Sequence, residues 1–589
     1  MTGRRAGAPA GLRRRRRRLV LRLSVLAAGL VLPASASAHA YLVKTVPAAS
    51  VVLDTPPPNI QLTYDEAVEP KFAIISVTNA AGRQETTGPA RRAPADPDTL
   101  IVPLRGGLPE GWYLIYWRAV SVDGHPVQGA FTYAIGPNPG PAPQFQVPRI
   151  AATATAPQLL VTRWLMFVTV MAAIGLLALR LVIVRPVVRR VPGVSTRQVS
   201  VAFVVASVAG LIAILVYLDF SIANDSLRSV FDLTALVPLY GVTAFGRGIL
   251  DLELCFALFC LAGWIALWLD HPERELRSVA ELLAGGGALL AAAAVCMVPG
   301  ASGHAAQTSP RGLTLFFDGL HVATASVWLG GLVGLLVLAA SVGSERRVAA
   351  LAAAVPRFSS VALVTVALLA GAGLGEAVDH MPALSALWDT GYGQAILVKT
   401  GLLGVALVLA SGNLLRSRPG LVAARERAEL GEPAGRLLRR LVSGEAVLVL
   451  AIVLAAAVLS SLAPPPPAFA LQSSAVASVG PGPVVRTVRQ AGYTLQLLVS
   501  PNKAAAPDTF ALRITRGGRP LRGASVTLTF NHTEMEMPQQ EYQLTETAPG
   551  LYTRAAPALV MVGRWALAFQ INPPGGAPVT ALVVDQANG

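Results

Sequence analysis

The chain has 589 residues, of which 53% are hydrophobic and only 14% are charged, and its mean hydropathy is +0.55. Soluble proteins carry roughly 25% charged residues, so the composition excludes a disordered protein and argues against a wholly soluble one. The formal net charge of +15 would suit a nucleic-acid-binding protein, but nine of the arginines lie within the first 38 residues. The three cysteines are too few for a disulfide scaffold.

Residues 1–38 have the three parts of a secretory signal peptide. They contain the nine arginines and no acid, an apolar run over residues 19–32, and Ala-Ser-Ala at 36–38. The apolar run is shorter than the roughly 20 residues of a membrane span, which favours cleavage over an uncleaved anchor. Cleavage makes His39 the first residue of the mature chain. Its amine and imidazole can chelate one metal ion, and Cu(II) prefers such ligands, although any residue can follow a cleavage site.

The next segment, residues 39–136, consists of short apolar runs separated by Gly and Pro, which predicts a small antiparallel β-sandwich. The predicted strands are residues 60–64, 72–77, 100–104, 112–120 and 130–135. Between the last two strands, a turn places Asp123 and His125 two residues apart. These side chains can converge on one metal ion, but Asp-Gly-His-Pro is also typical of an ordinary hairpin turn.

The same segment resembles the CopC family of copper-binding domains over essentially its whole length. The resemblance rests on the sequence His-Ala-Tyr-Leu at 39–42, on residues 62–69 and on residues 117–126, which include Asp-Gly-His-Pro. It implies that His39, Asp123 and His125 bind Cu(II). Some members of the family also have a methionine-rich Cu(I) site, but no methionine lies between Met1 and Met166, so only the Cu(II) site is expected here.

After a linker at 137–156, residues 157–462 predict a polytopic α-helical membrane core. Eight apolar runs are each long enough to span a bilayer, at about 157–184, 198–221, 245–268, 279–300, 313–341, 357–377, 392–415 and 440–462. With residues 39–136 outside, sixteen arginines lie in the predicted inner loops and only Arg228 and Arg311 in the outer loops. Positive residues favour the cytoplasmic side, so the pattern supports this orientation and places both terminal domains outside.

Candidate metal ligands in this region lie at the outer side of the predicted spans. His321 is in the outer half of the fifth span, three residues after Asp318 and on the same helical face. Imidazole and thioether groups suit copper, and an ionisable residue within a span is functional by default, whereas methionine in a span is more often a packing residue. The main candidates are His304, His321 and His380, and the weaker ones are Asp318, Met297 and Met381.

This region resembles the CopD-like copper-resistance membrane domain, most clearly over the fourth to eighth spans. The resemblance rests on residues 302–305, 318–321, 328–332 and 398–402, with Asn413 and Glu445. It implies movement of copper across or into the membrane.

A second linker, residues 463–490, leads to residues 491–589, where alternating runs predict another small β-sandwich. The predicted strands are residues 494–499, 510–514, 524–530, 551–552 and 564–569. Its segment 531–538 contains His532, Met535 and Met537, and one face of an extended strand would carry both thioethers. These residues form either a Cu(I) site or a strand edge with two packing methionines. The module resembles YtkA-like domains at residues 550–552 and 561–565.

The sequence therefore predicts a multi-pass protein of the cytoplasmic membrane that is not an enzyme. We expect its N-terminal module to capture Cu(II) and pass it to the membrane domain, for uptake or for tolerance. The expected partners are copper ions, the lipid bilayer and an extracytoplasmic copper chaperone or reductase, with no nucleic acid. The alternative is a copper-dependent oxidoreductase that uses an N-terminal histidine brace. A haem carrier is disfavoured because only His321 lies well within a span.

Overall fold

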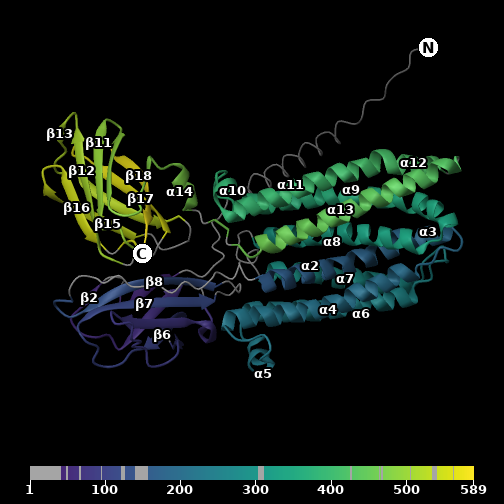
Figure 1. Ribbon diagram of the computed structural model, residues 1–589, viewed down its shortest axis with the longest axis horizontal. Coiled ribbons are helices and arrows are strands. Elements are labelled where there is room, and N and C mark those ends of the chain that lie inside the picture. Colours follow the sequence, from purple (N-terminus) through teal and green to yellow (C-terminus); the bar gives the residue numbers. More distant parts are fainter. Residues whose placement is uncertain are drawn as a thin grey trace, which may run out of the picture.

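The computed structural model describes residues 42–47, 51–64, 68–94, 96–120, 126–139, 157–302, 311–424, 427–462, 464–465, 468–504, 506–533, 540–556, 558–560 and 563–588. Within these residues, two β domains flank a bundle of long helices in sequence, and both lie at the same end of that bundle (Figure 1). This confirms the predicted architecture of a polytopic helical core with two small β domains.

The N-terminal domain is a sandwich of two four-stranded sheets, ordered β1-β3-β6-β5 and β2-β8-β7-β4. Side chains alternate across each strand, so that Ile60 and Leu62 of β3 are fully buried between the sheets. The strand predicted at 72–77 starts later because Pro70–Phe72 form a 3-10 turn, η1, in which proline fixes the backbone angle φ. The strands are β1 Leu42–Val46, β2 Val52–Leu53, β3 Asn59–Tyr64, β4 Ile74–Asn79, β5 Arg91–Ala93, β6 Asp96–Pro103, β7 Gly111–Val120 and β8 Pro126–Ile135.

Among the described residues, eight helices are long and apolar enough to cross a membrane, which confirms the predicted number and order of spans. Several are longer than their apolar runs because the helix continues into polar residues at its ends. The main helices are α2 Pro157–Leu179, α4 Arg197–Ser226, α6 Ala244–Leu269, α7 Val279–Ser302, α8 Arg311–Ser341, α9 Ser344–His380, α11 Gly391–Gly412 and α13 Gly431–Leu459. Shorter ones are η3 Arg180–Val184, α3 Arg185–Arg190, α5 Leu233–Leu236, η4 Val237–Leu239, α10 Ala386–Asp389, η6 Asn413–Ser417, α12 Arg418–Ala423, η7 Ala428–Leu430 and α14 Phe469–Ser473.

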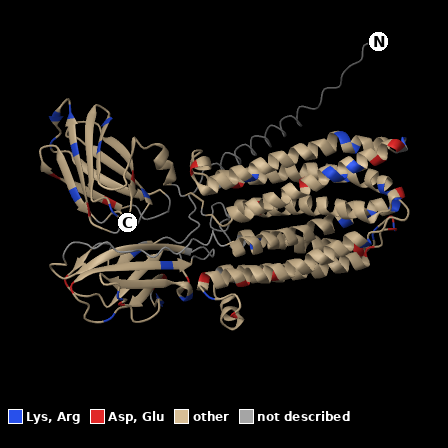
Figure 2. Ribbon diagram, in the orientation of Figure 1, with Lys and Arg blue, Asp and Glu red and all other residues tan. Residues whose placement is uncertain are grey.

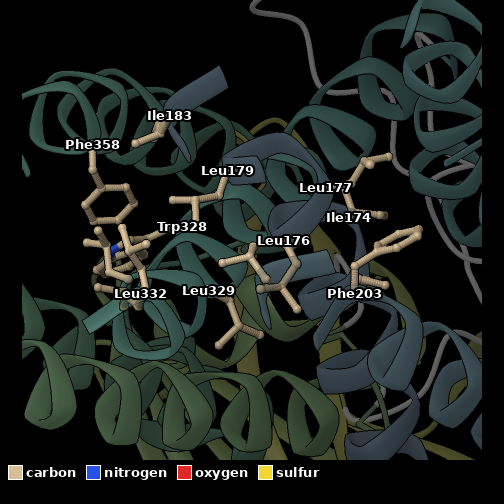
Figure 3. Close-up of a cluster of buried hydrophobic side chains, with 14 of the residues drawn as sticks. Ile174, Leu176, Leu177, Leu179, Ile183, Phe203, Trp328, Leu329, Leu332 and Phe358 are labelled. Carbon is tan, nitrogen blue, oxygen red and sulfur yellow. The ribbon is translucent and has the colours of Figure 1, made fainter. Parts of the chain in front are cut away.

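The centre of the bundle is the crossing of α2 and α8. A Cβ atom on Gly175 would lie 2.7 Å from Gly330 Cα, and one on Gly330 would lie 2.4 Å from Gly175 Cα, so the two backbones are in direct contact. Large side chains surround this crossing, among them Leu176, Trp328 and Leu329 (Figure 3). Small residues that allow close backbone approach are the usual basis of helix association in a bilayer, where burial of apolar surface gives little driving force.

Replacing Gly330 with valine is expected to separate α2 from α8, because no space exists for the added atoms. Purified protein in detergent should show a clearly lower thermal unfolding midpoint and a lower folded yield. Gly404 of α11 is the matched control, because a Cβ there would meet no atom within 4 Å, so Gly404→Val should unfold near the wild-type temperature. Equal midpoints for the two variants would show that the crossing is not a tight contact.

Arginines and acids form a buried ionic cluster at the end of the bundle away from the β domains. Arg180 Nη1 lies 2.7 Å from Asp270 Oδ2, and Arg185 Nε lies 3.1 Å from Asp270 Oδ1. The three side chains are 3–6% exposed. Figure 2 shows that many of the Lys and Arg residues of the bundle gather at this end.

The C-terminal domain is one strongly curved sheet folded over a single apolar core (Figure 1). Its strand order is β10-β11-β12-β16-β15-β14-β17-β18-β9, and β13 pairs with β12. Trp565 and Phe530 are among its fully buried side chains. The strands are β9 Ala477–Val479, β10 Val484–Gln490, β11 Tyr493–Ser500, β12 Asp508–Arg516, β13 Arg519–Pro520, β14 Ser525–His532, β15 Gln540–Ala548, β16 Leu551–Ala556, β17 Gly563–Asn572 and β18 Val579–Ala587.

Two aspartates in this domain make its stability depend on pH. Asp508 and Asp585 are fully buried, and Asn502 Nδ2 donates a hydrogen bond of 3.0 Å to Asp585 Oδ1. Burial raises the pKa of each carboxyl to about 6, and the charge of Asp585 also raises the pKa of Asp508.

We expect the C-terminal domain to lose stability as the pH rises from about 4 to above 6. An exposed Asp has a pKa of about 3.9, so in this range the unfolded chain has lost protons that the folded domain retains. A rise in pH favours the state with fewer bound protons, here the unfolded one. Hydrogen exchange of β12 and β18, corrected for intrinsic rates, should show more protection at pH 5 than at pH 7. Asp508→Asn should shrink this difference, and an unchanged difference would contradict the assignment.

Candidate metal sites

The residues proposed for the N-terminal Cu(II) site, His39, Asp123 and His125, lie outside the described residues, as does His304. The structure describes the two strands that flank the predicted turn. These strands, β7 and β8, are antiparallel partners, with Val120 opposite Pro126. The chain segment that contains Asp123 and His125 therefore connects the ends of two paired, largely buried strands.

His321 lies between three helices in the membrane domain. It belongs to α8, and a Cβ on Gly373 of α9 would lie 3.0 Å from its ring carbon Cε1. Lys399 Nζ of α11 lies 3.4 Å from the ring nitrogen Nε2. Thr390 caps the start of α11 by accepting a 3.0 Å hydrogen bond from the Gly393 amide, which fixes the helix that carries Lys399. The absence of a side chain at Gly373 leaves room for the imidazole.

Charged residues of three helices meet around this imidazole. Lys399 interacts electrostatically with Asp318 of α8 and with Glu376 of α9. The formal charges of these three groups give one negative charge in excess, beside a nitrogen ligand. The sequence interpretation quoted Lys399 only as part of a motif and did not single out Glu376. The signal that identifies both is a charged residue inside an apolar span, which is costly unless it has a partner or a function.

Asp318 and Met297 lie in the contact between α7 and α8. Two glycines make room for them: a Cβ on Gly319 would lie 2.3 Å from Met297 Sδ, and a Cβ on Gly300 would lie 2.4 Å from Asp318 Oδ2. Asp318 is also one helical turn before His321. A thioether, a carboxylate and an imidazole thus lie along one short stretch of α8.

His380 is the last residue of α9, although the sequence predicted it in the following loop. Its Nδ1–H donates a 2.8 Å hydrogen bond to the carbonyl of Glu376, one turn earlier, and this bond extends the ordered helix to His380. Met381 follows as the C-cap residue. Glu376 interacts electrostatically with Lys399, whose Nζ lies 3.4 Å from His321 Nε2.

In the described part of the chain, no three His, Cys, Asp or Glu side chains form a group that could hold a metal ion. The described candidates lie on separate helices: Met297 is on α7, Asp318 and His321 are on α8, and His380 ends α9, with Met381 directly after it. Two of them, Met297 and Met381, are thioethers.

His532 ends β14 and is only 2% exposed. Its ring stands edge-on to the Trp565 ring, with centroids 4.9 Å apart and an interplanar angle of 87°. The core of the C-terminal domain thus sets the position of this imidazole. Met535 and Met537 lie outside the described residues.

Three parts of the chain match known protein families, in the predicted order. Residues 42–136 match the CopC domain, residues 352–459 match Copper resistance protein D, and residues 487–570 match the YtkA-like family.

Known proteins resemble both the whole chain and its N-terminal part. Copper transport protein CutJ of Bacillus subtilis (strain 168) is 27% identical over 544 residues, which cover 91% of this chain and 93% of CutJ. Protein YobA of Escherichia coli (strain K12) is 38% identical over 113 residues, 19% of this chain and 90% of YobA. Copper resistance protein C of Escherichia coli is 36% identical over 124 residues, 20% of this chain and 98% of that protein. The chain therefore belongs to the CopC and CopD family of copper transport and resistance proteins, with a CopC domain, a CopD membrane domain and a YtkA-like domain in that order.

Proposed function

We propose that this protein captures copper outside the cytoplasmic membrane and passes it to ligands in its membrane domain. The observation that carries the proposal is the position of His321, an imidazole within a membrane span. The Asp318 carboxylate lies one turn earlier on the same helix, and the Met297 thioether of α7 packs against the neighbouring Gly319. Such residues are costly in a bilayer and suit copper in either oxidation state. The similarity to CutJ over 91% of the chain supports copper as the ion.

The arrangement of the domains supports an extracytoplasmic location for both β domains. They lie at one end of the bundle, whereas many of the bundle's Lys and Arg residues lie at the other end (Figure 2). Under the positive-inside rule, the arginine-rich end faces the cytoplasm. A signal peptide at 1–38 would place the mature N-terminus on the same side as both β domains.

In this proposal, His39, Asp123 and His125 hold Cu(II), and His304, His380 and Met381 lie at the outer surface of the membrane domain. The next ligands are Met297, Asp318 and His321. Thioethers favour Cu(I), so Cu(II) must gain one electron before it reaches them, and an extracytoplasmic reductase would supply that electron. A chaperone would instead deliver copper that is already reduced to Cu(I). His532, Met535 and Met537 would form a further Cu(I) site. The copper transfer serves either copper uptake or copper tolerance.

The Lys399 ammonium gives the membrane site a built-in cation. It donates a hydrogen bond to His321 Nε2, so that nitrogen cannot bind copper until Lys399 moves away. An arriving cation can replace it beside Asp318 and Glu376, with which Lys399 interacts electrostatically. The ammonium group of Lys399 thus occupies the proposed site before copper arrives.

The test is copper accumulation and copper tolerance in cells that produce the wild type, a His39 variant that preserves cleavage, or His321→Ala. Both variants are expected to lose most of the change in cellular copper that the wild type causes. His271→Ala is the control, since this exposed imidazole lies at the arginine-rich end of the bundle. Wild-type behaviour of both test variants would overturn the proposal. The oxidoreductase alternative is not favoured, because CutJ and the copper resistance proteins are named for transport and resistance.

A further inference from the structure

The N-terminal domain is fixed to the membrane domain at the end of β7. Arg118 Nη1 donates a 3.1 Å hydrogen bond to the backbone carbonyl of Asp225, near the end of α4. Both residues are only 3% exposed. Asp225 is in the last turn of α4, whose carbonyls have no partner within the helix, so Arg118 satisfies one of them from the other domain.

An apolar cluster surrounds this hydrogen bond and includes residues of both domains. Phe72 of η1 and Val120 of β7 are 2% and 1% exposed, which is unusual for side chains at the edge of a small soluble domain. They pack against a surface of the membrane domain that we call the platform. The platform consists of Leu218, Ile222, Ala223 and Leu236, each at most 2% exposed.

Local interactions shape the platform and hold it in place. Leu227, with a left-handed φ of 54°, ends α4, and the Arg228 amide then donates to the Ala223 carbonyl. Asp232 caps α5, and the Tyr240 hydroxyl donates a 2.7 Å hydrogen bond to Asp219 Oδ1 of α4. The segment that carries Leu236 is therefore tied back to α4 at both of its ends.

The docked position bears on how copper leaves the N-terminal domain. The linker at 137–156 has 20 residues and is rich in Pro and Gly in its first part, which would suit a domain that detaches and swings. The interface favours the opposite arrangement, because detachment would expose Phe72 and Val120 and leave Arg118 without its buried acceptor. Val120 is in the interface and is also three residues before Asp123 in sequence.

We propose that copper transfer takes place while the N-terminal domain stays docked on the platform. This inference rests on the proposed function, since it states the arrangement in which the same transfer occurs. The partner of the CopC domain is thus the platform of its own chain, recognised by an apolar surface and one buried backbone carbonyl.

The deciding experiment links the N-terminal domain covalently to the platform in the full-length protein. Phe72→Cys combined with Ile222→Cys places thiols on η1 and α4, which are in contact, and Phe72→Cys with Ala223→Cys is the alternative pair. Mass spectrometry distinguishes the new crosslink from the native Cys255, Cys260 and Cys296. We expect cells with the crosslinked protein to keep at least half of the wild-type copper accumulation, before and after reduction. Loss of accumulation that returns on reduction would overturn the docked mechanism.

A second set of variants disrupts the interface between the N-terminal domain and the platform. Phe72→Asp and Arg118→Ala are expected to lower copper accumulation at least fivefold while Cu(II) binding to the full-length protein stays unchanged. Val52→Asp is the matched control, because Val52 is 50% exposed on the same domain, and it should behave as wild type. Wild-type accumulation by both dock variants would overturn the inference. His321→Ala separates the two ideas: its inactivity together with an inactive crosslinked protein refutes only the dock, whereas active His39 and His321 variants refute the proposed function itself.

Discussion

Replacing Lys399 with leucine is expected to increase the affinity of the membrane domain for Cu(I) at least tenfold. The change removes the cation that lies 3.4 Å from His321 Nε2 and leaves Asp318 and Glu376 for the metal ion alone. Two unit charges about 6 Å apart interact by roughly 3 kcal/mol at an effective dielectric constant of 20, and about 1.4 kcal/mol corresponds to a factor of ten. Competition of the full-length protein with a colorimetric Cu(I) chelator measures the affinity.

Lys399→Arg is the control for this prediction, because it keeps the positive charge while changing the shape of the group. Its Cu(I) affinity should stay closer to the wild-type value than that of Lys399→Leu. Ag(I), a soft monovalent ion that needs no reductant, should show the same order of affinities. If Lys399→Leu binds both ions no more tightly than the wild type, Lys399 does not compete with metal at His321.

Replacing Asp270 with alanine is expected to reduce the free energy of unfolding by about 3–5 kcal/mol, the usual cost of removing one partner from a buried ion pair. The change leaves the guanidinium groups of Arg180 and Arg185 without the carboxylate that both contact. Arg180 follows α2 and Asp270 follows α6, so the arginine-rich end of this helix pair should open first. Thermal unfolding in detergent measures the loss, and hydrogen exchange locates it.

The pair Arg436–Glu432 provides the matched control on α13. Its side chains are 62% and 56% exposed and lie 3.9 Å apart, so water and salt screen their attraction. Glu432→Ala should therefore leave the unfolding midpoint almost unchanged. A similar loss in both variants would mean that burial does not set the strength of the Asp270 interactions.

Much of the fold could be predicted from the sequence because each part has a simple periodic signal. Apolar runs of about 20 residues predicted all eight spans. They include the span with Asp251 and Glu253, which belongs to α6 in the structure. Alternation gave the central strands of both β domains, such as β7 and β17. Polar strands like β15 were missed, because one of their faces is largely exposed and the apolar alternation is weak.

The candidate membrane site was less predictable, because it depends on which helices become neighbours. His321 and Asp318 could be proposed from their spacing on one helix, whereas Lys399 is 78 residues away from His321 in sequence. Pairing between them requires α11 to lie near α8, and no local pattern encodes that. The interface between the N-terminal domain and the platform could not be predicted for the same reason. Arg118 and Asp225 are 107 residues apart, and each looks like an ordinary polar residue by itself.

The glycine contact at the crossing of α2 and α8 limits how this protein can change shape. Because the two backbones are in direct contact, a shift of one along the other would bring larger neighbouring residues into collision, so we expect α2 and α8 to move as one unit. The spans of α9 and α11 have only 11% and 6% of their most apolar stretches buried inside the protein, and they carry Glu376 and Lys399. We therefore expect any motion that opens the His321 region to be a movement of α9 and α11 relative to α2 and α8. The imidazole of His321, which belongs to α8, would keep its position during that motion.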